Sequence, residues 1–246
     1  MPNYFDAQIY GAGVNAYGRT LVQGSGTIGG TRGVFVKLQS NGKNGLVFPT
    51  FGGKLANPFL GPAKIFAGDL FEYNPGIGSE DGATVKLLKT YEVITDASEA
   101  TEIDIVRNGF RHIPFVGDIL MVAPDEIDGT GTASTVTAVE VTTNDDGYKV
   151  WRLTVDTAIT ASAGDILVEC DADGNPIVTN PNSYAPADID TKHVPVTGDD
   201  DFDGARYMIT PALANEDTIL YQHKMTPVPA SVLALNQSKV EGWFHL

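Results

Sequence analysis

Between about residues 65 and 171, apolar and polar positions alternate in short runs bounded by turn residues, which predicts antiparallel β-strands. The clearest pair joins Ser134–Val141 to Tyr148–Val155 across the turn Asn144–Gly147. Gly147 would supply the positive φ that a bulged hairpin loop needs. In the second strand, alternate residues from Trp151 to Val155 share one face, as in a half-buried antiparallel strand. The pattern therefore predicts a β-hairpin.

A Gly-Asp pair precedes an apolar run at three places, Gly68-Asp69, Gly117-Asp118 and Gly164-Asp165. Glycine tolerates a tight bend, and an aspartate carboxylate can accept hydrogen bonds from nearby backbone N–H groups. Each pair therefore predicts a turn that leads into a core strand. The pairs recur roughly every 48 residues, a spacing compatible with a duplication, although the matched windows are too short to require one.

Residues 1–62 are rich in glycine and have no helical periodicity, as at Gly11-Ala12-Gly13 and Gly24-Ser25-Gly26. Such backbone loses much conformational entropy on ordering and buries little surface in return. We expect this segment to be an extended docking arm that becomes fixed by lying on another subunit.

Residues 172–246 contain seven prolines and shorter apolar runs. Because proline interrupts β-ladders, we expect a mostly irregular region with strands near Tyr207–Ile209 and Ile219–Tyr221. The apolar end Val240–Leu246 should pack on its own domain or on a neighbouring subunit. With residues 63–171 as the core, the sequence predicts a mainly β fold, a small antiparallel barrel or sandwich.

The chain is strongly acidic, with 16 lysines and arginines against 31 aspartates and glutamates, a formal net charge of −15. No window concentrates the basic residues, so counterion release would not favour nucleic-acid binding. An acidic surface suits a protein exposed to bulk solvent on the outside of an assembly. No stretch reaches the roughly 18 apolar residues of a membrane span, and Met1–Asp6 has no signal-peptide pattern. We expect synthesis in a cytoplasm and no membrane partner.

Two motifs suggest ligands but are incomplete. Gly24–Gly29 matches a dinucleotide-binding fingerprint, yet no strand precedes it, glycines interrupt any following helix, and residues 46–51 have no carboxylate. Asp199–Gly204 matches the first half of a calcium loop, with Asp199, Asp201 and Asp203 at alternate positions, but the twelfth position is Thr210. We expect no cofactor and favour an acidic solvated loop over a calcium site.

No catalytic or metal-binding constellation emerges from the remaining residues. The four histidines, His112, His193, His223 and His245, are far apart and have no zinc spacing. The single cysteine, Cys170, lies in an apolar run and is expected to be a buried, inert thiol. Most aspartates lie in predicted turns, where they favour local hydrogen bonds, although paired catalytic acids of the glycosidase type stay open because their separation is not visible in a sequence.

Three segments have amino-acid sequences that resemble those of the head fibre and auxiliary head proteins of tailed bacteriophages, particularly Bacteroides-infecting and crAss-like phages. They are Gly68–Tyr73, Arg111–Val122 and Ser238–Phe244. The resemblance extends from about residue 65 to the C-terminus. It consists of similar short stretches of sequence in a similar order, without a short diagnostic motif.

The resemblance implies a non-enzymatic virion protein that binds the major capsid protein on the outer face of the head, as a homotrimer and without cofactor, catalytic or metal residues. It leaves open whether the protein is a short decoration protein or the base of a longer fibre. The alternative is a tail-associated or receptor-binding protein that recognises host surface glycan. Tyr184, Phe202 and Tyr207, near the acidic loop, are the aromatic candidates for that role.

Overall fold

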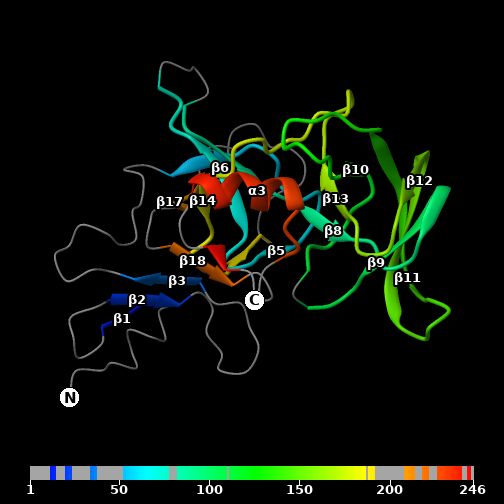
Figure 1. Cartoon of the computed structure of the whole chain (residues 1–246), viewed down its shortest axis with the longest axis horizontal. Helices are drawn as coiled ribbons and strands as arrows, with labels where there is room; N and C mark the ends of the chain where they lie inside the picture. The colour runs from blue at the N-terminus through cyan, green and yellow to red at the C-terminus, as the bar shows by residue number, and fades with distance from the viewer. Residues whose placement is uncertain are drawn as a thin grey trace.

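The structure is a computed structural model, and its fold is mainly β and sandwich-like, with several antiparallel sheets, as the sequence predicts (Figure 1). It describes side chains in residues 52–77, 82–109, 111–186, 188–191, 209–213 and 226–235. It describes the backbone alone in residues 12–14, 20–23, 34–37, 208, 218–221, 236–239 and 243–244.

One six-stranded antiparallel sheet has the strand order β8-β13-β10-β11-β12-β9. In that order its strands are Thr90–Glu92, Ile166–Glu169, Ile119–Val122, Ser134–Thr143, Lys149–Ala161 and Ala97–Val106. The chain just beyond β8 meets β9 at an isolated bridge between Val93 and Ile105, although no continuous ladder closes the sheet among the described residues. The sheet thus curls around an apolar core that includes Leu120, Leu153 and Leu167.

A second six-stranded sheet has the order β16-β4-β7-β6-β14-β17. In that order its strands are Met208–Ile209, Gly53–Leu55, Thr84–Leu87, Leu70–Asn74, Ser183–Tyr184 and Ala212–Leu213. Only β4 and β7 run parallel among the described pairs of this sheet. Beside it, β5 (Lys64–Ile65) pairs with β15 (Ile189–Asp190). Residues of the predicted arm beyond position 52 belong to this unit, because Leu55 and Phe59 are buried in its core.

The third sheet brings the two ends of the chain together in the order β1-β2-β3-β18-β19. Its strands are Ala12–Val14, Thr20–Gln23, Val34–Lys37, Thr218–Tyr221 and Trp243–Phe244. The apolar C-terminal end therefore pairs with its own chain, since β19 runs parallel to β18. That the N-terminal segment docks on another subunit stays a prediction, as do the proposed domain boundaries.

The predicted hairpin is present as β11 and β12, whose register pairs Val141 with Trp151 and Val139 with Leu153. A shift in that register between Val136 and Ala138 marks an irregularity in β11. Gly147 has the expected positive φ of 84°. Leu153 is buried, whereas Thr154 on the other face is half-buried.

All three Gly-Asp pairs form the predicted turn, and the three turns share one hydrogen-bonding scheme. The glycines have φ of 91°, 97° and 93°. Each aspartate N–H donates to the carbonyl three residues earlier, and its carboxylate accepts the N–H of that same residue. Each glycine N–H and aspartate C=O also pairs with one residue of a neighbouring segment, respectively Ala185, Val136 and Val93. The strands β6, β10 and β13 follow directly.

The helix α3 (Ala230–Lys239) lies in the region expected to be irregular, so that expectation was wrong for these residues. Prolines in that region argued against regular structure, but Pro229 stands immediately before the first helical residue, where proline is well tolerated. The helix packs Val232 against Leu70, Val178 and Tyr184 of the second sheet's core. No helix among the described residues is long and apolar enough to span a membrane.

Candidate functional site

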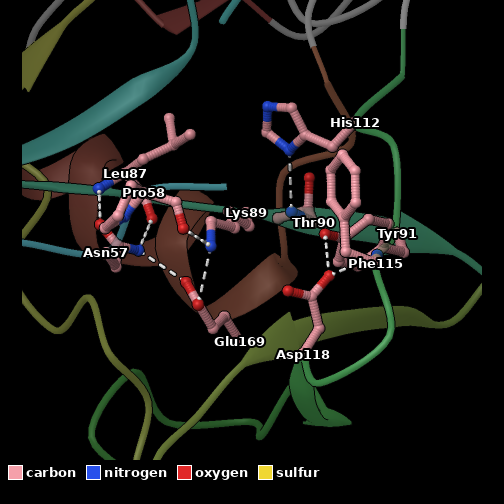
Figure 2. Close-up of polar contacts among 10 residues, drawn as sticks. All are labelled: Asn57, Pro58, Leu87, Lys89, Thr90, Tyr91, His112, Phe115, Asp118 and Glu169. Atoms are coloured by element: carbon pink, nitrogen blue, oxygen red, sulfur yellow. Dashed lines mark hydrogen bonds and ion pairs between the residues drawn. The ribbon is translucent and has the colours of Figure 1, made fainter. Parts of the chain in front are cut away.

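The most concentrated chemistry in the described structure is a buried polar cluster between the two six-stranded sheets (Figure 2). We define the buried polar cluster as Asn57, Asp69, Lys89, Thr90, Tyr91, His112, Asp118 and Glu169, of which Thr90 takes part through its backbone N–H and the others through their side chains. Its members come from the segment after β4, the turn before β6, the junction of β7 and β8, the loop between β9 and β10, and β13. The cluster therefore joins parts of the chain that are distant in sequence.

Glu169 holds one half of the cluster, because its two carboxylate oxygens bind two different nitrogen groups. Lys89 Nζ donates to Glu169 Oε1 at 2.8 Å, and Asn57 Nδ2 donates to Glu169 Oε2 at 2.6 Å. The Lys89 side chain is 1% exposed, donates also to the Pro58 carbonyl at 3.0 Å, and lies 5.1 Å from the centre of the Phe59 ring. Burial raises the pKa of Glu169, and the Lys89 charge opposes that rise.

The Asn57 carboxamide is fixed at both ends by the backbone of Leu87. Leu87 N–H donates to Asn57 Oδ1 at 2.7 Å, and Asn57 Nδ2 donates to the Leu87 carbonyl at 2.8 Å. The Asn57 amide thus pairs with the end of β7 through two hydrogen bonds, as the backbone of a neighbouring strand would. The same Nδ2 also donates to Glu169 on β13.

His112 and Asp69 form the other half of the cluster and are fully buried, with Nε2 and Oδ2 2.9 Å apart. Thr90 N–H donates to His112 Nδ1 at 3.1 Å, so Nδ1 is an acceptor and the hydrogen of the neutral ring lies on Nε2, towards Asp69. Asp69 also accepts from Thr226 Oγ1 at 2.5 Å and from Phe66 N–H at 2.6 Å. In a hydrolase triad, one ring nitrogen of the histidine would face a nucleophile. Here Nδ1 faces the Thr90 N–H and Nε2 faces the Asp69 carboxylate.

In the described part of the structure, Asp118 is bonded through only one of its two carboxylate oxygens. Its Oδ2 accepts from Phe115 N–H at 2.8 Å and from the Tyr91 hydroxyl at 3.2 Å. Its Oδ1 is buried and has no hydrogen-bond partner among the described residues. Burial raises the pKa of Asp118, and burial together with the Asp118 charge raises the pKa of Tyr91 well above its usual value.

The space beside the cluster is small. A cavity of about 10 Å³ is bordered by Lys89 and Glu169 and otherwise mainly by apolar side chains such as Leu88, Ile127 and Val178. That volume accommodates about one water molecule. It would not admit a sugar ring, so the cavity that Glu169 borders is not a glycan cleft.

A larger opening of about 490 Å³ lies between α3 and the loops that flank β10 and β13. Its lining is mainly apolar, with Val122, Ile166 and Leu233 among the contributors. Asp125 and Asp165 supply its charged side chains, and the Asp165 carboxylate already accepts the Ser162 N–H at 2.7 Å. The opening thus offers few polar groups that could orient a ligand.

The burial of two residues singled out in the sequence, Tyr184 and Cys170, can be compared with expectation. Tyr184 is fully buried, so it cannot stack on a glycan at the surface as the alternative function required. Cys170 is buried as expected, and burial raises the pKa of its thiol to about 12.

Several other candidates fall outside the described residues. They are Gly24–Gly29, the acidic loop with Asp199, Asp201 and Asp203, the aromatic residues Phe202 and Tyr207, and the histidines His193, His223 and His245. Within the described part of the chain, no group of three or more histidine, cysteine, aspartate or glutamate side chains is placed to hold a metal ion.

Sequence reasoning missed the association of Asn57, Lys89 and Glu169. The only local signal is a lysine inside the apolar run Leu87–Tyr91, where a buried cation needs a partner. The partner, Glu169, is 80 residues away, and Asn57 is 112 residues from Glu169. Comparison with known proteins does not supply a function for this cluster, since no family model, no curated protein and no solved structure matches the chain.

Proposed function

We propose that the chain is a non-catalytic structural subunit on the outer surface of a tailed-phage head, bound to the major capsid protein. One observation supports the structural part of this proposal: the side chains of the buried polar cluster bond to one another and to the backbone, and these bonds connect the two six-stranded sheets. Lys89, Glu169 and His112 bond to partners inside the protein and leave room for about one water molecule beside them.

The location on a phage head rests on the resemblance of Gly68–Tyr73, Arg111–Val122 and Ser238–Phe244 to head fibre and auxiliary head proteins. The net charge of −15 is in keeping with a solvent-facing position and disfavours a DNA-facing one.

A candidate contact surface lies around the second Gly-Asp turn. Leu60 is 40% exposed and Val116 is 58% exposed. The two segments touch, since a Cβ on Gly117 would lie 3.1 Å from Leu60 Cδ1 and one on Gly61 would overlap Phe115. Exposed apolar side chains gathered on neighbouring loops are typical of a protein contact.

Co-sedimentation with phage heads that lack this chain tests the proposal. We expect the purified protein to pellet with such heads in a saturable way, and Val116→Asp to weaken the binding while leaving the melting temperature near that of the wild type. Ser162→Asp, a change at the exposed start of the third Gly-Asp turn, is the control and should bind normally. Binding to host cells or hydrolysis of a host glycan, without binding to heads, would contradict the proposal.

The proposal includes a homotrimer, because the resemblance to head fibre and auxiliary head proteins implies one. Light scattering should then give three times the 26.2 kDa of one chain at micromolar concentration. A mass of 26.2 kDa throughout that range would argue against the trimer.

A further inference from the structure

Lys89 Nζ and Asn57 Nδ2 donate to the two oxygens of one carboxylate, that of Glu169, where Lys89 is buried and Asn57 and Glu169 are half-buried (Figure 2). An ion pair alone would need only the lysine and the glutamate. The third member is a carboxamide, whose carbon is an electrophile, and the lysine amine is a nucleophile. Glu169 contacts the attacking nitrogen and the nitrogen that would leave.

We propose that Lys89 and Asn57 become joined by an intramolecular amide bond, formed by the folded chain itself with Glu169 as the proton carrier. The inference does not depend on the capsid proposal, because its argument uses only these three side chains and their surroundings.

The reaction balances without any oxidant, reductant or further reactant. Glu169 takes a proton from the Lys89 ammonium group, and the free amine attacks Asn57 Cγ, so that the new C–N bond forms and the carbonyl electrons move to Oδ1. Glu169 then passes its proton to Nδ2 and accepts the second proton from Nζ. The Cγ–Nδ2 bond breaks, ammonia leaves, and it takes up the proton held by Glu169. The net products are a secondary amide and one ammonium ion.

The groups that would stabilise charge and transfer protons are in place. Leu87 N–H, 2.7 Å from Asn57 Oδ1, polarises the carbonyl and would stabilise the oxygen anion of the intermediate. Glu169 contacts Nζ and Nδ2 at 2.8 and 2.6 Å, within the range for proton transfer. Its raised pKa, caused by burial, favours the protonated form that the second half of the reaction needs.

The surroundings favour the amide over the separate groups. Lys89 is 1% exposed and lies against the Phe59 ring, so water that could hydrolyse an intermediate is largely excluded. The cavity of about 10 Å³ beside Lys89 and Glu169 is large enough for one molecule of the size of ammonia.

Mass spectrometry of the intact, purified full-length protein tests the inference. We expect a mass lower than that of the sequence by one ammonia. Glu169→Gln and Lys89→Arg should both restore the full mass expected for the variant, because the first cannot carry the proton and the second has no nucleophilic amine. Lys86→Arg is the matched control. Lys86 lies on β7, is more exposed than Lys89 and pairs with Glu72, so this variant should still lack the mass of one ammonia.

Peptide mapping locates the bond. Asn41-Gly42 and Asn44-Gly45 could also lose ammonia by forming succinimides, so the intact mass alone does not decide. Trypsin cannot cleave after an acylated lysine, and the proposal therefore predicts that residues 55–64 are recovered covalently joined to residues 87–107. Recovery of residues 55–64 and 90–107 as separate peptides, with or without an ammonia deficit elsewhere, would overturn the inference.

Discussion

His112 Nε2 lies 2.9 Å from Asp69 Oδ2, and neither side chain is exposed to solvent. Asp69 belongs to the first Gly-Asp turn, whereas His112 belongs to the loop that leads to the second turn. The pair therefore ties the turn before β6 of one sheet to the loop before β10 of the other.

Replacing His112 by alanine should lower the free energy of unfolding by about 3 kcal/mol, because the change leaves a cavity, the buried Asp69 carboxylate and the Thr90 N–H without their partner. His112→Gln should cost less, since a glutamine amide can still donate to Asp69. Urea unfolding of both variants measures the difference. Equal losses in the two variants would show that packing, and not the bond to Asp69, accounts for the effect.

The three Gly-Asp turns were predictable because their signal is local. Glycine at a tight bend followed by a carboxylate that bonds backward involves only four consecutive residues, as in Ser162–Asp165. The hairpin of β11 and β12 was predictable for the same reason, since its strands are joined by the short turn that ends at Gly147. Such features need no information from the rest of the chain.

The buried polar cluster was not predictable, because its contacts depend on the tertiary fold. Nothing local to Asn57 indicates that its amide will bond to Leu87 and Glu169. The helix α3 was missed for a different reason: the expectation of irregular structure rested on the prolines of its region, although proline before a helix is compatible with its first turn.

The turn glycines provide a test of the backbone argument. A Cβ on Gly164 would meet nothing within 4 Å, so Gly164→Ala should act through the backbone alone. Because φ is 93° there, alanine should cost about 1–2 kcal/mol of unfolding free energy. Gly109→Ala is the control, since it also has open space but no positive φ, and should cost less than about 0.5 kcal/mol. Equal effects at both positions in thermal unfolding would contradict the left-handed turn.

Asp118 should give the protein a measurable pH dependence of stability. Since burial raises its pKa in the folded state, a proton binds more tightly to the folded than to the unfolded chain. This group therefore stabilises the fold at low pH, and that contribution is lost as pH rises through the raised pKa. Asp118→Asn removes the titration and should retain the bonds to Phe115 N–H and the Tyr91 hydroxyl.

The stability of Asp118→Asn relative to the wild type should accordingly increase as the pH rises above the ordinary aspartate pKa of 3.8, as measured by urea unfolding at each pH. The pKa of Glu169 shifts in the same direction, and the Asp118 charge contributes to that rise, so the difference between the two proteins reports Asp118 together with its effect on Glu169. A relative stability that falls over this range would mean that the charged Asp118 carboxylate is favoured in the fold.

Arg152 on β12 and Asp104 on β9 form a two-pronged pair, with Nε–Oδ1 at 2.7 Å and Nη2–Oδ2 at 2.8 Å. Arg152→Ala should cost about 1 kcal/mol, because the arginine is partly solvated while the Asp104 carboxylate is largely buried. Arg152→Lys should recover only part of this, since an ammonium group cannot reproduce the paired geometry. Lys149→Ala, an exposed change on the same strand, serves as the control in thermal unfolding.

The proposed role as a structural subunit on the outside of a phage head can be tested by incubating intact virions of a phage whose genome carries this sequence with gold-conjugated antibodies raised against the purified protein. That role predicts label distributed over the head surface, at many copies per particle, with the tail unlabelled. Label confined to the tail tip, or label that appears only after the heads are broken open, would contradict it.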